Sequence, residues 1–279
     1  MTIEIAFSRD PEFTKLLGRR TDVDLTYAAL ELARDAYPSL DFNQTLGWIN
    51  ARRAELAGPV ARAKSEIDAL RELACCLGET HGIAGDQGAY ERADSSYLNR
   101  VIETKRGIPI SLSVLYIAVA QSLGLELQGV GAPMHFLTRL ESCEEPMFLD
   151  AFSHGRILTL DECVQWLQSI TGMSTEQVTS RLQPVSSRPI IIRMLTNLKS
   201  LYTQQEDWAA ACGVQQRLTA LLPTSYLERR DLGIIALHAN RPGQAIDVLQ
   251  TCLKTCPSGD ADVLKHHICE AQTQLAHWN

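Results

Sequence analysis

Residues 94–150 read DSSYLNRVIETKRGIPISLSVLYIAVAQSLGLELQGVGAPMHFLTRLESCEEPMFLD, which predicts a helix, a Gly-Pro break, a nearly all-apolar helix and then short strands. Between residues 108 and 125 only five side chains are polar. A helix that is apolar on almost every face is surrounded by protein rather than lying on the surface. Gly107 allows a sharp turn, and Pro109 fits the first helical position, where its missing N–H costs nothing. We therefore expect a central buried helix over Ser111–Leu123.

Ser111 falls in the first turn of this predicted helix. Backbone N–H groups are free there, and the helix dipole favours developing negative charge. A serine nucleophile is well served in such a place, and so is a serine that only caps the helix. The sequence leaves both interpretations open.

His135 and Asp150 lie in two segments with the composition of strands, HFLTRL and MFLDAF, joined by the polar sequence ESCEEP. If the turn centres on Ser142-Cys143, His135 lies directly opposite Asp150. Opposed residues have β-carbons about 4.5–5.5 Å apart, close enough for an imidazole–carboxylate hydrogen bond. Such a carboxylate fixes the tautomer and orientation of a catalytic histidine. The alternative is a buried histidine that is satisfied by a neighbouring acid.

A resemblance to the SirB-type branch of the transglutaminase-like superfamily is carried by three segments, YLNRVIETKRGIPISLSVLYIAVAQSLGL, GVGAPMHFLTRL and FLDAFSHGRILTL. It is close over residues 94–160, and its most specific pieces are RGIPISL, PMHF and D-x-F-x-x-G. The resemblance implies an α+β fold, with a papain- or transglutaminase-like core of helices around a small antiparallel sheet, followed by all-α tetratricopeptide-like repeats. It also implies that His135 and Asp150 correspond to the catalytic His and Asp of the superfamily. The catalytic Cys, whose usual position falls near Pro109, is not kept.

No other cysteine is expected to replace the missing nucleophile. Cys143 lies eight residues from His135, about 26 Å along an extended strand at ~3.3 Å per residue. Cys75, Cys76 and Cys163 lie in predicted helices, and a free cysteine is most often buried by packing. The predicted site therefore consists of Ser111, His135 and Asp150, as a relict or weak catalytic site without a cofactor or a metal.

The segment GETHGIAGDQGAY, residues 78–90, is rich in glycine. It lacks the G-x-x-x-x-G-K-[ST] order of a phosphate-binding loop. We interpret it as a flexible loop and expect His81 to be exposed to solvent.

Composition limits the classes of function. The chain has 279 residues, 45% of them hydrophobic, which is enough for a large core and two domains. A net charge of −7 argues against binding nucleic acid or anionic lipid through a broad basic face. The start, MTIEIAFSRD, has neither a basic n-region nor an apolar h-region, so we expect no secretion signal. Eight cysteines without regular spacing suggest reduced thiols, and we expect a cytoplasmic protein without a membrane span.

Beyond the core, a repeat appears. We expect a first domain over residues 1–183, a polar, proline-bearing linker over 184–189 and helical repeats over 190–279. Four pairs of residues lie 34 positions apart, the tetratricopeptide period: Leu198 and Leu232, Leu201 and Ile235, Ala211 and Ala245, Pro223 and Pro257. Such arrays usually bind peptides or proteins on a concave face.

A set of cysteines and histidines near the end of the chain resembles a zinc motif: Cys252, Cys256, His266, His267 and Cys269. Shifted back by one repeat, its three cysteines fall on Leu218, Leu222 and Ile235, which are packing positions. We therefore expect these cysteines to pack in the core.

Three functions are compatible with these features. The first is a cytoplasmic interaction or regulatory protein whose core is catalytically silent and holds a protein or peptide, aided by the repeats. The second is a serine-dependent hydrolase or acyl transferase that uses Ser111, His135 and Asp150. The third is a small-molecule or peptide binding module that uses the relict cleft.

Overall fold

The computed structural model describes residues 7–141 and 145–277. The chain divides into two compact units, Phe7–Met194 and the residues from Leu195 onwards. Helix α10 (Ser187–Gln204) contains the boundary between the units. The stretch 184–189, which we expected to be a linker, is therefore helical from Ser187 onwards.

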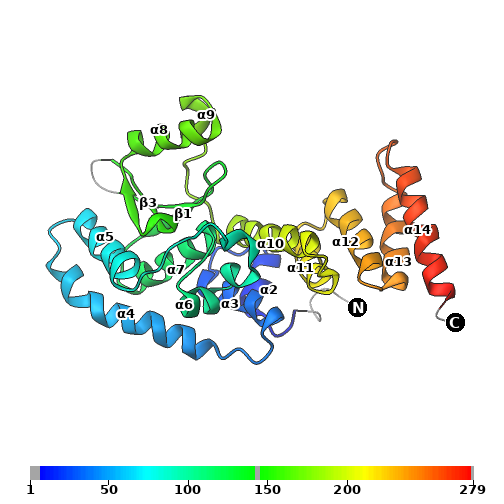
Figure 1. Cartoon of the computed structure of the whole chain (residues 1–279), viewed down its shortest axis with the longest axis horizontal. Helices are drawn as coiled ribbons and strands as arrows, with labels where there is room; N and C mark the ends of the chain where they lie inside the picture. Colours follow the sequence, from blue (N-terminus) through cyan, green and yellow to red (C-terminus); the bar gives the residue numbers. More distant parts are fainter. Residues whose placement is uncertain (1–6, 142–144, 278–279) are drawn as a thin grey trace. The chain divides into compact units, whose positions relative to one another are not determined.

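The first unit is mostly helical and contains a small antiparallel sheet, as predicted (Figure 1). The sheet order is β1-β2-β3-β4, and each strand pairs with the next in the chain. The strands are β1 (Leu127–Val130), β2 (Leu137–Leu140), β3 (Met147–Asp150) and β4 (Arg156–Leu158). The α-helices are α2 (Pro11–Leu17), α3 (Leu25–Ala36), α4 (Phe42–Arg62), α5 (Glu66–Ala74), α6 (Leu98–Thr104), α7 (Pro109–Ser122), α8 (Leu160–Thr171) and α9 (Thr175–Thr179). Shorter turns are the π-helix η1 (Cys75–Thr80) and the 3₁₀ helices η2 (Ala89–Glu91), η3 (Ala93–Ser96) and η4 (Ala151–Ser153).

Helix α7 is the centre of the first unit. Every residue from Pro109 to Ala120 is buried, which confirms the predicted central helix. The helix packs against β1 and β2 on one side and against α3, α4 and α6 elsewhere. Gly107 lets its first turn fit, because a β-carbon there would lie only 2.8 Å from Ser111 Oγ.

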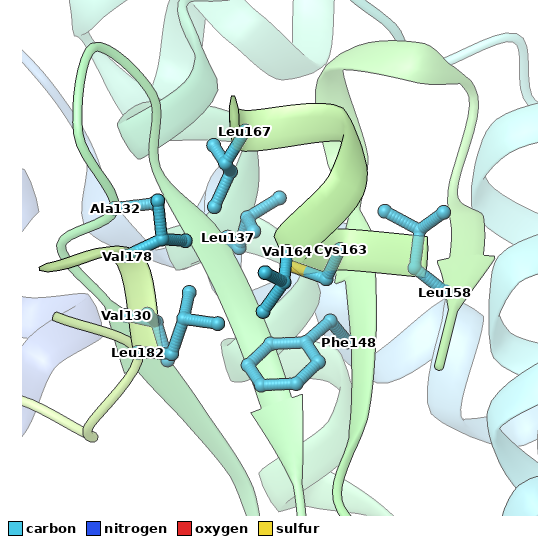
Figure 2. Packing of buried hydrophobic residues seen from close by; sticks show 10 residues of the cluster. All are labelled: Val130, Ala132, Leu137, Phe148, Leu158, Cys163, Val164, Leu167, Val178 and Leu182. Carbon is cyan, nitrogen blue, oxygen red and sulfur yellow. The ribbon is translucent and has the colours of Figure 1, made fainter. Parts of the chain in front are cut away.

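The other face of the sheet is covered by α8 and α9 (Figure 1). Ten buried residues pack between them, among them Phe148 of β3 and Leu167 of α8 (Figure 2). Helix α8 begins with a capping box, in which Thr159 and Glu162 each accept a hydrogen bond from the other's backbone N–H. The sheet is therefore buried on both faces, between α7 and α8.

The glycine-rich segment at residues 78–90, which we expected to be a loop, begins inside the π-helix η1 and ends in the 3₁₀ helix η2, and two of its glycines are closely packed. A β-carbon at Gly78 would lie 2.0 Å from the carbonyl oxygen of His154, and one at Gly85 would lie 2.0 Å from the Phe152 ring. Gly85 also donates a backbone hydrogen bond to Phe152, at 2.9 Å. Gly78 and Gly85 therefore allow the segment to approach residues 152–154.

The second unit consists of paired helices, α11 (Trp208–Leu221), α12 (Tyr226–His238), α13 (Pro242–Leu253) and α14 (Ala261–Ala276). Consecutive helices pack on one another. Ala211 and Ala245, one repeat apart, are both fully buried. Cys252 is buried as predicted, but Cys269 is exposed, because α14 buries only the face that carries Leu264, Ile268 and Ala271. In the described residues no helix has the length and apolar character needed to cross a membrane.

Replacing Gly85 by Ala tests this packing. The new methyl group must displace the Phe152 ring, and overpacking of this kind costs about 1–3 kcal/mol of unfolding free energy. Gly47→Ala, in α4, is the matched control, because its β-carbon meets no atom within 4 Å and the change should be neutral or stabilising by up to about 1 kcal/mol. Urea unfolding measures both variants. Equal stability of the two variants would contradict the close approach.

Candidate functional site

The candidate site is built around the contact between His135 and Asp150. His135 Nε2 lies 2.8 Å from Asp150 Oδ1. The imidazole is 11% exposed and the carboxylate 1% exposed. The predicted pairing of these two side chains is therefore confirmed.

The register that produces this contact differs from the predicted one. Thr138 pairs with Leu149, so the two strands are shifted by two residues relative to a turn centred on Ser142-Cys143. Those two turn residues lie outside the described part of the chain. His135 precedes β2, in a turn where Met134 has a positive φ of 58°. A shift of two residues keeps each side chain on its face of the sheet, and the turn brings the imidazole back to the end of β3.

The carboxylate of Asp150 is held by several donors. Besides His135, it accepts hydrogen bonds from Phe152 N at 3.1 Å and from Ser153 Oγ at 2.6 Å. Burial acts to raise the pKa of Asp150, but the hydrogen bonds from His135, Ser153 and Phe152 outweigh it, and the pKa lies below its ordinary value. Asp150 is therefore a buried anion that fixes the orientation of the imidazole.

Aromatic rings enclose the imidazole. The rings of Phe152 and Trp166 meet His135 edge-to-face, with centroids 5.9 Å and 5.1 Å away. The ionised carboxylate accepts a hydrogen bond from the Nε2–H of His135, which leaves Nδ1 as the second polar atom of the ring, without a hydrogen-bond partner among the described residues. That nitrogen can accept a proton or a hydrogen bond from a ligand.

Arg193 holds the turn that carries His135. Its guanidinium donates to the carbonyl oxygens of His135, at 2.8 Å, and Ala132, at 3.4 Å, and lies over the Phe136 ring. Burial lowers the pKa of Arg193, and the hydroxyl of the half-exposed Tyr90 lies close enough to oppose this effect. The roles of Arg193, Tyr90 and Trp166 were not predicted from the sequence, because no local pattern indicates partners that lie more than 30 residues away along the chain.

Ser111, the third predicted site residue, makes no hydrogen bond to the imidazole of His135 among the described residues. It is fully buried. Its hydroxyl faces two carbonyl oxygens, that of Ser95 at 2.5 Å and that of Ile108 at 3.0 Å. The sequence left open a nucleophile or a serine that caps the helix. The hydroxyl donates to carbonyl oxygens, and α7 has no side-chain cap at its start, so Ser111 does not cap the helix. Cys143 lies outside the described residues, and burial raises the pKa of the Cys163 thiol to about 12.

One group of side chains could hold a metal ion, which the sequence analysis did not expect. Glu55, Cys76 and His81 bring one ligand atom each within 4.8 Å of one another in the described chain. From the sequence we expected Cys76 to be buried by packing and His81 to be exposed in a loop. Cys76 is buried as expected, but Cys75, for which packing was also expected, is exposed, and the His81 side chain is only 24% exposed.

Replacing Asp150 by Asn tests the role of the carboxylate. Because its pKa is lowered in the folded state, Asp150 stabilises the fold above the ordinary carboxyl pKa of about 4, and this contribution is lost as the pH falls through the lower folded value. We expect the variant to be about 1–3 kcal/mol less stable at neutral pH, with a difference that shrinks towards pH ~3. Urea unfolding across this range measures it, with the exposed Glu126→Gln as control. A difference that stayed constant with pH would refute the assignment.

Replacing Arg193 by Met tests the support of the turn. The variant loses two charge-assisted hydrogen bonds to the carbonyls of Ala132 and His135, which should cost about 2 kcal/mol. Amide hydrogen exchange of residues 132–136 should accelerate, because the turn loses its outer contact. The exposed Arg181→Met is the control. Unchanged exchange in the Arg193 variant would show that the turn holds itself.

Comparisons with known proteins agree with this arrangement. Residues 44–196 match the family model of the transglutaminase-like superfamily, and residues 198–268 match a tetratricopeptide repeat model. The chain is 31% identical to a UPF0162 protein of Xylella fastidiosa (strain Temecula1) over 258 residues, 90% of each chain. It is 30% identical to a UPF0162 protein of Vibrio cholerae over 189 residues, 67% of this chain and 70% of the relative.

A third relative is the protein SirB1 of Salmonella typhimurium, which is 24% identical over 198 residues, 71% of this chain and 74% of the relative. No solved structure matches the chain. The family match covers more than half of the chain, and the Xylella relative covers nearly all of it. The chain therefore belongs to the transglutaminase-like superfamily, with tetratricopeptide repeats after the core.

Proposed function

We propose that this chain is a cytoplasmic interaction or regulatory protein whose transglutaminase-like core is catalytically silent and whose repeats hold a protein or peptide partner. The observation that carries the proposal is the position of Ser111. Its side chain is fully buried, and its hydroxyl is directed at backbone carbonyls. The family and the repeats suggest the same kind of role.

A serine needs two things to attack a substrate, access and a base. A hydroxyl at its ordinary pKa is a poor nucleophile unless a neighbouring base takes its proton. The single proton of Ser111 is already shared between the carbonyl oxygens of Ser95 and Ile108. Each of these carbonyls also accepts a backbone N–H, from Ile108 and Leu112 respectively, so freeing the hydroxyl costs only its own hydrogen bonds, about 0.5–1.5 kcal/mol each. This disfavours a serine-dependent hydrolase or acyl transferase.

The imidazole of His135 suits binding without catalysis. It is oriented by a buried carboxylate, enclosed by Phe152 and Trp166, and retains Nδ1 for a ligand. A peptide amide or a small polar group satisfies such a nitrogen as well as a nucleophile would. The relict cleft is therefore proposed as a secondary contact for a peptide or a small molecule.

The repeats are proposed as the main partner surface. Arrays of this kind bind extended segments of other proteins. Leu227 in α12 and Val263 in α14 are 55% and 53% exposed, large apolar side chains that a partner can cover. The seven cysteines in the described ranges are free thiols, which supports a reducing compartment such as the cytoplasm.

A fluorophosphonate probe tests catalytic silence. We expect the native protein to remain unlabelled at Ser111, because the hydroxyl is buried and hydrogen-bonded. Intact-mass measurement with peptide mapping reports the labelling, and His135→Ala is the matched variant. Stoichiometric labelling of Ser111 that is abolished by His135→Ala would establish the hydrolase instead.

A photo-crosslinking residue at position 227, introduced in the cells that make the protein, tests the interaction role. A silent scaffold should form the same protein adduct in the native background and in the His135→Ala and Ser111→Ala backgrounds, because binding needs no proton transfer. Loss of the adduct in the two site variants, with unchanged melting temperatures, would mean that partner binding depends on chemistry at the site.

A further inference from the structure

We propose that Glu55, Cys76 and His81 form a binding site for a divalent cation of the zinc type. Glu55 lies on α4, Cys76 lies in the π-helix η1, and His81 ends that π-helix. One ligand atom from each of the three lies within 4.8 Å of the others. The site shares no residue with the pair His135 and Asp150, and it does not depend on the function proposed above.

The π-helix brings Cys76 and His81 together. His81 N donates to the carbonyl oxygen of Cys76 at 2.9 Å, a hydrogen bond between residues five apart. In an α-helix, residues five apart would be separated by about 140° of rotation at 3.6 residues per turn. The wider turn reduces this angle and places the thiol and the imidazole on the same side. Single π-turns inserted in helices occur frequently at functional sites.

The three donors are the types that zinc prefers. Thiolate, imidazole and carboxylate bind Zn²⁺ at about 2.0–2.3 Å in tetrahedral sites. Donor atoms around such an ion are about 3.5 Å apart, as follows from those bond lengths. His81 Nε2 already lies 2.9 Å and 3.2 Å from the two oxygens of Glu55. Small side-chain rotations therefore suffice to admit the ion.

Arg52 supports the carboxylate from outside the group. Its Nε lies 3.0 Å from Glu55 Oε2, and its guanidinium lies 4.9 Å from the centre of the Trp48 ring. Ligating carboxylates are usually held by such outer partners. The ion pair with Arg52 involves Oε2, whereas Oε1 lies 3.2 Å from His81 Nε2, a contact that a bound cation would replace. The charge of Arg52 opposes a second positive charge, but a thiolate and a carboxylate together supply two negative charges.

Exposure indicates how the site would be used. The Glu55 side chain is 40% exposed and that of His81 is 24% exposed, whereas Cys76 is 6% exposed. The sulfur therefore lies at the inner side of the group, and the other two ligands face solvent. Three protein ligands leave the fourth tetrahedral position for water or an added ligand. On binding, the thiol loses its proton to the solvent as the metal–sulfur bond forms.

The alternative is a simple ion pair between His81 and Glu55 that ties η1 to α4. An ion pair needs no sulfur, so the requirement for the Cys76 thiolate distinguishes a metal site from an ion pair. Zinc titration of the chelator-treated full chain, in competition with a chromogenic chelator, gives the stoichiometry and the affinity. Cobalt substitution shows whether a thiolate binds, through a sulfur-to-metal charge-transfer band.

We expect one zinc ion per chain, a cobalt charge-transfer band and a zinc-dependent rise in melting temperature. Cys76→Ser and His81→Gln should weaken zinc binding by more than about 100-fold, beyond the effect of losing an outer partner. Cys75→Ser, which removes the neighbouring exposed thiol, should change nothing. Glu55→Gln should also weaken binding, and because Glu55 is exposed this variant keeps the fold even if the buried Cys76 variant does not.

Three results would overturn the proposal. The first is the absence of stoichiometric zinc binding to the native chain. The second is zinc binding that is unchanged in both His81→Gln and Glu55→Gln while their melting curves stay cooperative. The third is a cobalt spectrum without the sulfur band, or with a band that is lost in Cys75→Ser and kept in Cys76→Ser.

Discussion

Burial of α7 from Pro109 to Ala120 is the constraint on which the rest of the first unit depends. A helix with no solvent-facing side must be covered all round, and the sheet together with α3, α4 and α6 provides that cover. The same burial makes a polar group on the helix costly unless it finds a partner inside the protein. Ser111 finds them in backbone carbonyls, whereas Ser113 Oγ and Tyr116 Oη have none among the described residues. The helix that forms the core is therefore a poor place for a reactive hydroxyl.

Asp150 shows the opposite solution to the same problem. A buried charge is tolerated when donors surround it. The donors come from the imidazole, from one hydroxyl and from one backbone N–H, and together they keep the carboxylate ionised. The backbone N–H and the hydroxyl belong to η4, which directly follows β3, so the short turn at Ala151–Ser153 both ends the strand and fixes the anion. Strand end, anion and imidazole are consequently one structural unit.

The central helix and the small sheet were predictable because their signals are local: an apolar run and a strand composition. The helical repeats were predictable from a period of 34 residues in the sequence. The pairing of His135 with Asp150 was predictable for a related reason, since a shift of two residues preserves the face of the sheet. The turn that returns His135 to β3 was not, because it depends on a positive φ at Met134 and on Arg193, 58 residues away. Contacts over that distance leave no local pattern.

The predictions for the glycine-rich segment and for Cys269 were wrong for another reason. Composition does not distinguish a glycine needed for freedom from one needed for close approach, and Gly78 and Gly85 belong to the second kind. Likewise, the repeat period assigned Cys269 to a packing position, but burial requires a helix on both sides, and α14 packs on one side only. Periodicity specifies which positions are equivalent, whereas burial depends on which neighbours are present.

The two carboxylates of the polar clusters differ in the freedom that their surroundings leave them. Asp150 is 1% exposed and accepts three hydrogen bonds, most of the roughly four lone-pair positions of a carboxylate. It can orient an imidazole, but a metal ion would have to displace its donors from a closed site. Glu55 is 40% exposed, and its partners are the imidazole of His81, the thiol of Cys76 and the guanidinium of Arg52. Its side chain can turn without disturbing the core, so it can exchange a hydrogen bond for a metal bond. Burial therefore restricts Asp150 to orienting the imidazole, whereas the exposure of Glu55 leaves it able to act as a ligand in the proposed site.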